Sequence, residues 1–231
     1  MTKSPIVTGA SVVGVKYRDG VLLVSDTLAS YGSLAKFTGV SKFRKVGEST
    51  VIGASGEYSD FQYIGDTLDE ISDREWAQAD GELMAPKSWS AYLCRLLHGR
   101  RNKMDPLLNQ IVLGGVDKRT GESYLSYIDL YGTTYEDDFI ATGYGGHLAI
   151  PILREQARLD MSLEEAIELL RHCMRILFYR DCRTTDKVQF AKVTRDGSVE
   201  ISGIEKLETK WDHQLWTTPT ITLGPMLGAS W

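Results

Sequence analysis

The sequence lacks several features that mark whole classes of protein. It holds only three cysteines, at 94, 173 and 182, which are too few and too scattered for a disulfide framework. No run of about 18 apolar residues occurs, so the sequence predicts no membrane-spanning helix. The first five residues lack the apolar core of a secretory signal. These absences favour a soluble intracellular protein, and we expect no membrane partner.

An excess of positive charge is also missing. Lysine and arginine number 26 against 31 aspartate and glutamate residues, which gives a net charge of -5. The one basic run, Arg100 to Lys103, is short, so we expect no nucleic-acid partner. With 42% apolar and 25% charged residues, the 231-residue chain has the composition of an ordinary globular protein.

Motifs for metals and phosphates are scarce. Cys94 and His98 lie four residues apart on a predicted helix, a spacing that could hold a metal, but no third or fourth ligand accompanies them. The glycine clusters at 114–115 and 143–146 match neither the P-loop nor the dinucleotide fingerprint and predict tight turns instead. We therefore expect no metal and no cofactor.

The chain does contain a series of predicted β-hairpins. Residues 12–16 and 21–25 form apolar strands around Asp19-Gly20, a strong hairpin signal. Further strand pairs are predicted at 41–46 with 50–54, 110–116 with 123–130, 133–135 with 139–141, and 188–193 with 199–201.

Segments with helical periodicity lie between these predicted hairpins. Apolar residues recur at three- and four-residue spacing from Phe61 to Ile71, and Pro86 opens a second helix. A shorter helical stretch follows the glycines at 143–146, and a capping-box pattern at 162–165 begins the longest helix. Strands and helices in this order predict an α+β fold, a four-layer αββα sandwich of two antiparallel sheets flanked by helices.

The ends of the chain differ from this pattern. We divide the chain into an N-terminal extension (1–9), one domain (10–207) and an extended C-terminal tail (208–231). The tail carries Trp211 and Trp216 without a sustained period. Exposed tryptophans need a surface to cover them, so we expect these two to bind a partner.

Asp26, Lys42 and Asp181 are the first candidates for chemistry. Adjacent strands could bring Asp26 and Lys42 together, and a buried lysine beside a carboxylate is a recurring site device. Spacing alone favours the simpler alternative, in which these are ordinary surface charges.

Eight short motifs resemble those of a known protein family. Three are general to the family, and five are specific to one of its members. Gly-Val-Leu-Leu-Val-Ser-Asp at 20–26, Gly-Ala-Ser-Gly-Glu at 53–57 and Tyr-Arg-Asp at 179–181 are general marks of it. From about Ile6 to Trp216 the chain resembles the β subunits of the 20S proteasome. The specific motifs resemble one non-catalytic member, and they lie at 5–9, 30–34, 100–107, 141–145 and 175–181.

The resemblance implies an N-terminal-nucleophile hydrolase fold with a vestigial site. In active members a threonine hydroxyl attacks the peptide carbonyl, and its own α-amine acts as the base. Here the threonine position falls on Ala10, the site lysine on Lys42 and the two site acids on Asp26 and Asp181. The two site serines fall on Tyr144 and Thr184.

Alanine has no hydroxyl, so the resemblance implies a chain that is not an enzyme. Loss of a nucleophile alone can lower the rate on the order of 10⁶-fold. A relocated nucleophile is the alternative, at Ser11, roughly 3.3 Å further along a strand, or at Thr8, roughly 7 Å back. Either would also require a new cleavage of the chain.

The function implied is structural. We expect a non-catalytic assembly subunit that supports ATP- and ubiquitin-dependent protein degradation by active neighbours, in cytoplasm and nucleus. Its expected partners are subunits of the same β ring, the α ring and the opposite β ring, which the tail is expected to clasp. A free-standing binding domain that borrowed the fold is a third possibility.

Overall fold

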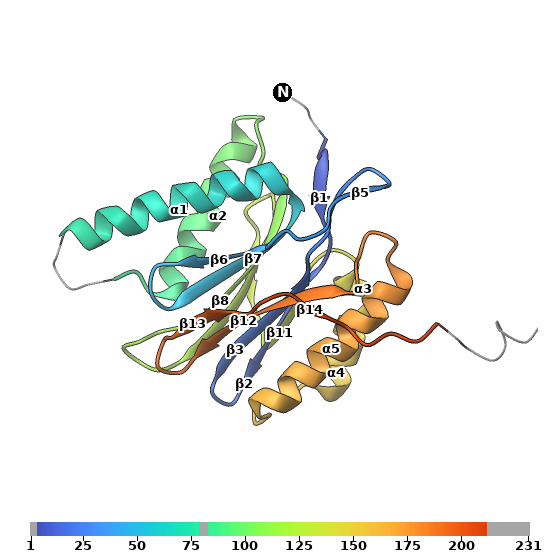
Figure 1. Cartoon of the computed structure of the whole chain (residues 1–231). Helices are drawn as coiled ribbons and strands as arrows, with labels where there is room; N and C mark the ends of the chain where they lie inside the picture. Colours follow the sequence, from blue (N-terminus) through green and yellow to red (C-terminus); the bar gives the residue numbers. More distant parts are fainter. Residues whose placement is uncertain (1–3, 79–82, 212–231) are drawn as a thin grey trace, which may run out of the picture.

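The computed structural model describes residues 4–78 and 83–211. Two antiparallel sheets lie face to face, with helices on both outer faces (Figure 1). The predicted α+β sandwich is confirmed. No helix among the described residues is long and apolar enough to cross a membrane.

The first sheet has the strand order β10-β9-β8-β7-β1-β4-β5, with β6 paired to β7. Helices α1 (Tyr58–Gln78) and α2 (Pro86–Asn102) cover its outer face. Its strands are β1 (Val7–Gly9), β4 (Ala29–Tyr31), β5 (Leu34–Phe37), β6 (Phe43–Val46), β7 (Thr50–Glu57), β8 (Asn109–Val116), β9 (Ser123–Ile128) and β10 (Thr134–Glu136).

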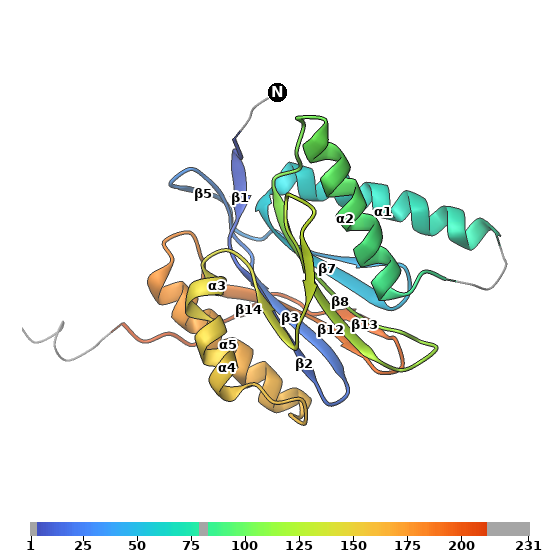
Figure 2. The same cartoon turned by 180° about the vertical axis from the view of Figure 1, so that it is seen from behind.

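The second sheet has the order β11-β2-β3-β12-β13, with β14 paired to β12. Helices α4 (Ile150–Gln156) and α5 (Leu163–Arg180) cover it, and the short α3 (Gly145–Leu148) leads into them (Figure 2). Its strands are β2 (Val12–Tyr17), β3 (Gly20–Asp26), β11 (Phe139–Ala141), β12 (Lys187–Thr194), β13 (Val199–Ile201) and β14 (Glu205–Lys206).

Three apolar clusters fill the three spaces between the four layers. In the β2–β3 hairpin, Val13 and Val24 pack under α4 and α5, while Val12 and Leu23 pack between the sheets. Alternate residues of each strand therefore face different cores. Because both faces of the hairpin are buried, the sequence of its strands is a nearly continuous apolar run.

The capping box that begins α5 is confirmed. The Glu165 N–H donates to Ser162 Oγ at 3.3 Å, and the Ser162 N–H donates to Glu165 Oε2 at 2.8 Å. Two of the amide groups that a helix start leaves without intrahelical partners are thereby satisfied.

One predicted strand pair is wrong. Residues 133–135 and 139–141 were expected to pair with each other, but β10 pairs with β9 and β11 pairs with β2 in the other sheet. The chain crosses between the sheets at Asp137 and Asp138. The Asp137 N–H donates to the Leu125 carbonyl in one sheet, and the Asp138 carbonyl accepts from the Lys16 N–H in the other.

Four short strands, β1, β4, β5 and β14, were not predicted. Each has two to four residues, too few to show a period of two. Strand β1 lies within the predicted N-terminal extension and pairs with both β4 and β7. The sheet hydrogen bonding therefore continues into that extension, while the domain boundaries themselves stay a prediction.

Candidate functional site

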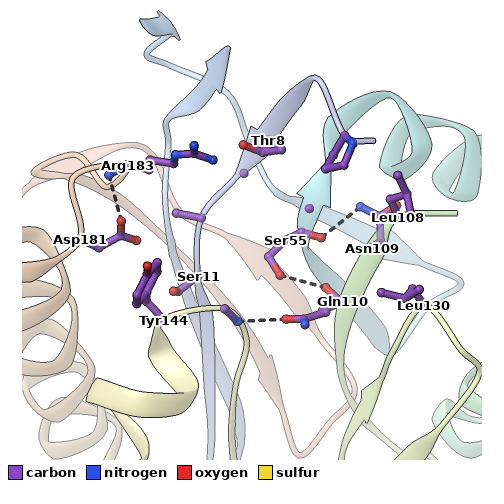
Figure 3. A pocket seen from close by; sticks show the side chains of 15 residues that line it. Thr8, Ser11, Ser55, Leu108, Asn109, Gln110, Leu130, Tyr144, Asp181 and Arg183 are labelled. Carbon is purple, nitrogen blue, oxygen red and sulfur yellow. Dashed lines mark hydrogen bonds between the residues drawn. The ribbon is translucent and has the colours of Figure 1, made fainter. Parts of the chain in front are cut away.

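Ala10 lies between β1 and β2, on the wall of a cavity of about 390 Å³ (Figure 3). Residues of β1, β7, β8 and the two turns around Tyr144 and Asp181 line most of the rest of this cavity. Its walls therefore come mainly from the first sheet and from the turns beside α3 and α5. Of the other residues of the predicted vestigial site, only Tyr144 and Asp181 line this cavity.

Asp26 and Lys42 form an ion pair beneath this region. The Lys42 ammonium donates to Asp26 Oδ1, and the two side chains are 1% and 0% exposed. The Leu28 N–H donates to Asp26 Oδ2 at 3.1 Å, and the Thr185 N–H also bonds the carboxylate. The interpretation of these residues as surface charges is therefore wrong: they pair inside the protein.

Burial determines the direction in which the pKa of Asp26 shifts. Removal from water raises the pKa of the Asp26 carboxyl above its ordinary value. The charge and hydrogen bond of Lys42, and the backbone donors, act in the opposite direction. The ion pair is thus held inside the protein against a desolvation penalty, which makes Asp26 dependent on Lys42.

Lys42 also lies against the backbone just before Ala10. A Cβ placed on Gly9 would lie 3.0 Å from Lys42 Cε and 3.6 Å from Nζ. The chain that precedes Ala10 therefore covers the lysine. In this chain Gly9 continues into Ala10 through a peptide bond, so the nitrogen of Ala10 is an amide here.

Asp181 and Thr184 form a compact turn after α5. Asp181 Oδ1 accepts from the Arg183 N–H at 2.9 Å, and Oδ2 accepts from Thr184 Oγ1 at 3.0 Å. Both side chains are buried. Since the next residue, Thr185, bonds Asp26, this turn connects the two predicted site acids. Both acids are therefore occupied by hydrogen bonds from their own chain.

Tyr144 stands apart from that network. Its side chain is largely exposed at the edge of the cavity, just before α3 (Figure 3). The predicted site is therefore only partly assembled. Asp26, Lys42, Asp181 and Thr184 lie in one buried network, whereas Ala10 and Tyr144 contribute only cavity wall.

The two alternative nucleophiles are both in use as structural groups. Ser11 is buried, and its Oγ accepts from the Gly145 N–H at 2.9 Å. Thr8 belongs to β1, where its backbone pairs with Ser30 and Glu57. The Thr8 hydroxyl itself lies 3.4 Å from Ser30 Oγ, so both hydroxyls have polar contacts within the chain.

The N-terminal strand is anchored through one carboxylate. The backbone N–H groups of Ile6 and Val7 both donate to Glu57 Oε2, the second at 3.1 Å. Glu57 ends β7 and is itself buried. Residues just before Ala10 are therefore fixed in the sheet by side-chain as well as ladder hydrogen bonds.

The sequence profile of one family, described as Proteasome subunit, matches residues 6–193, most of the chain. The chain belongs to the proteasome subunit family. Proteasome subunit beta type-4 of Arabidopsis thaliana is 44% identical over 219 residues, which cover 95% of this chain and 88% of that protein.

Two other relatives agree with this. Proteasome subunit beta type-4 of Xenopus laevis is 44% identical over 91% of this chain and 87% of its own length. Proteasome subunit beta type-7 of Saccharomyces cerevisiae is 36% identical over 91% of this chain and 83% of its own length. The predicted resemblance to one particular proteasome β subunit is confirmed, and that member is the type-4 subunit.

Sequence reasoning missed several polar residues of the cavity. Asn109 Nδ2 donates to the Ser55 and Glu57 carbonyls at 3.1 and 2.8 Å, and Gln110 Oε1 accepts from the Gly143 N–H at 3.0 Å (Figure 3). These residues stand at the start of an apolar strand, and only that contrast in polarity could have singled them out.

Cys94 and His98, whose spacing could hold a metal, each make a contact within the chain. Cys94 Sγ donates to the Gly132 carbonyl at 2.9 Å, and His98 bonds Asn102. Within the described ranges no group of three or more metal-ligating side chains is found. Trp211 lies edge-on to the ring of Tyr179 at 4.9 Å, whereas Trp216 lies outside the described residues.

Proposed function

We propose that this chain is a non-catalytic structural β subunit of the 20S proteasome core particle. In this proposal it assembles with other proteasome subunits and supports ATP- and ubiquitin-dependent degradation by active neighbours, in cytoplasm and nucleus. The observation that carries it is Ala10 at the head of the β2–β3 hairpin, with an unbroken strand β1 before it.

Three features support the absence of catalysis. Ala10 has no hydroxyl to attack a carbonyl, and its nitrogen is an amide rather than an amine. Lys42, which pairs with Asp26, lies against the backbone of Gly9, so the chain that precedes Ala10 covers it. The surrounding scaffold therefore keeps charged groups that stabilise the fold, without a group that could form a covalent intermediate.

An electrophilic probe for N-terminal nucleophiles tests this proposal directly. The chain, taken from its native assembly, is expected to keep its intact mass after treatment, because nothing at position 10 can attack the probe. Co-purifying proteasome subunits that retain a nucleophile are expected to gain the mass of the probe. Intact-mass spectrometry before and after treatment measures both.

The same experiment addresses the alternative activity. A chain that gains the probe, with an N-terminus newly formed at Thr8 or Ser11, would establish a relocated nucleophile and refute the proposal. The treated co-purifying subunits are the internal control, since their gain in mass shows that the probe was reactive.

We further propose that the C-terminal tail reaches a partner subunit in the opposite β ring. The part of the tail that the structure describes, residues 208–211, lies against the end of α5. The Glu208 carbonyl accepts from Arg175 Nε at 3.0 Å, and the Lys210 N–H donates to Tyr179 Oη at 2.7 Å. Trp211 packs edge-on against two rings at the end of α5.

Truncation after Leu207 separates folding from assembly. Leu207 is buried, its N–H donates to the Asp186 carbonyl at 2.7 Å, and β14 precedes it, so the truncated chain keeps its core. Its urea midpoint is expected to stay near that of the full chain, while the yield of assembled particles falls. The urea midpoint is measured on the isolated chain, and the particle yield on co-expressed subunits.

A normal particle yield from the truncated chain would refute the proposed role of the tail. A full-length chain that stays monomeric beside its partner subunits would instead favour a free-standing binding domain. Analytical ultracentrifugation of the co-expressed mixture distinguishes these two results.

A further inference from the structure

The turn that follows α2 presents one methionine in an unusual backbone conformation. Met104 has φ 56°, and it is the only non-glycine residue with positive φ in the described part of the chain. Left-handed backbone is unfavourable for residues that carry a Cβ. Something about this turn therefore holds Met104 in a conformation that its side chain disfavours.

The hydrogen bonds identify the turn as a Schellman motif. The Met104 N–H donates to the Arg101 carbonyl at 3.0 Å, and the Asp105 N–H donates to the Arg100 carbonyl at 3.1 Å. Met104 thus occupies the first position past the helix cap, where glycine is the usual residue. Ending the helix here would be easier with glycine, so helix termination alone does not account for a methionine.

Arg100 fixes the turn from the helix side. Its Nη2 lies 2.7 Å from Asp105 Oδ2, and its Nε donates to the Asp105 carbonyl at 3.1 Å. The guanidinium also lies over the ring of Tyr63, 5.4 Å from its centroid. Together these contacts hold residues 103–105 in one geometry.

Met104 gains little contact from its own chain in return. It is 86% exposed, the highest exposure among the large apolar residues of the described ranges. The C-terminal end of α2 stands clear of the sheets, at the same end of the molecule as β1 (Figure 2). An apolar, adaptable side chain is thus presented outward on a rigid base, which lowers the entropy lost when a partner binds it.

The surface around Met104 has the composition of a protein interface. Arg101 lies over the ring of Tyr131, 6.0 Å from its centroid, and Lys103 is exposed beside it. Tyr63 and Tyr131 are both about half exposed. Tyrosine, arginine and methionine are enriched at interfaces, and the exposed cations select a partner surface of opposite charge.

We propose that Met104 is an anchor that inserts into an apolar pocket with an acidic rim on a neighbouring proteasome subunit. This inference rests on the proposed assembly function, which supplies the partner. Arg101 and Lys103 would face the acidic rim, while Arg100 positions the turn through Asp105.

Substitution of Met104 by Gly tests the proposal, because it separates stability from assembly. Glycine adopts positive φ freely, so the Met104→Gly chain is expected to have a higher urea midpoint than the wild type. Its incorporation into particles is expected to fall by about tenfold or more, as for loss of an interface anchor. Tagged variant and wild type are co-expressed, and their ratio in particles is compared with that in the soluble pool.

Three further variants complete the test. Met104→Leu keeps an apolar side chain of similar size and is expected to incorporate like the wild type. Met104→Asn tolerates the left-handed backbone but is polar, and it is expected to fail like Met104→Gly. Lys103→Glu is expected to reduce incorporation most at low salt, because it opposes the acidic rim.

Equal incorporation of Met104→Gly, Met104→Asn and wild type would overturn the anchor. A wild-type chain that never enters particles would overturn the assembly function itself, and with it this inference. The two failures are therefore distinguished by the wild-type chain in the same experiment.

Discussion

Replacement of Lys42 by Met is expected to lower the free energy of unfolding by about 3–5 kcal/mol at neutral pH. The substitution leaves the Asp26 carboxylate buried beside an apolar side chain, with only backbone donors to satisfy it. An isolated buried charge is unfavourable because water no longer solvates it. Urea denaturation followed by tryptophan fluorescence measures the change.

The loss is expected to depend on pH. Burial already raises the pKa of Asp26, and removal of Lys42 takes away the largest opposing effect. The folded Met variant then binds a proton more tightly than its unfolded chain, so its stability falls as the pH rises through the interval between the two pKa values. Destabilisation relative to wild type is therefore expected to be smaller at pH 5 than at pH 8.

A double substitution provides the control. Asp26→Asn combined with Lys42→Met removes both charges and keeps an oxygen that can accept from the Leu28 N–H. Its destabilisation is expected to be smaller than that of Lys42→Met alone, because no charge is left without a partner. A double variant less stable than Lys42→Met at pH 8 would contradict this account of the pair.

Replacement of Gly56 by Ala is expected to lower the free energy of unfolding by about 3 kcal/mol or more, from backbone strain and close contact together. Gly56 has φ 96°, and a Cβ there would lie 2.1 Å from the Leu108 carbonyl oxygen. That oxygen is part of the backbone and accepts from the Glu57 N–H at 2.9 Å, so it cannot move away without breaking the bond.

The effect is expected to reach β1 as well, because Gly56 pairs with Gly9. Hydrogen exchange of the β1 amides should therefore become faster in the variant. Gly39→Ala is the matched control: Gly39 is exposed and nothing lies within 4 Å of a Cβ there. A change within about 0.5 kcal/mol is expected for it, and an equally small change for Gly56→Ala would refute the close approach.

Local sequence determined much of the fold. Turn residues such as Asp19-Gly20 and the capping box at Ser162 act over a few residues, so their outcome needs no distant partner. The apolar runs of β2, β3 and β8 likewise predict strands from local sequence alone. The resemblance to proteasome β subunits added the positions of Asp26, Lys42 and Asp181, which spacing alone left as surface charges.

Distant pairing was decided only by the tertiary structure. Residues 133–135 and 139–141 look like one hairpin, yet the chain crosses between sheets there, because Lys16 and Leu125 supply the backbone partners. Strand β1 has three residues and no period, and it forms because β4 and β7 leave unpaired edges on both sides of it.

In the candidate site, too, some features follow from the sequence and others only from the tertiary structure. The sequence by itself determined that position 10 holds no hydroxyl, since that depends on residue identity alone. Only the tertiary structure decided that Ser11 accepts from Gly145 and that Gly9 lies against Lys42, because these contacts join segments that are far apart in the chain. Likewise the sequence supplied Met104, but its outward presentation depends on backbone angles that a helix cap and Arg100 impose together.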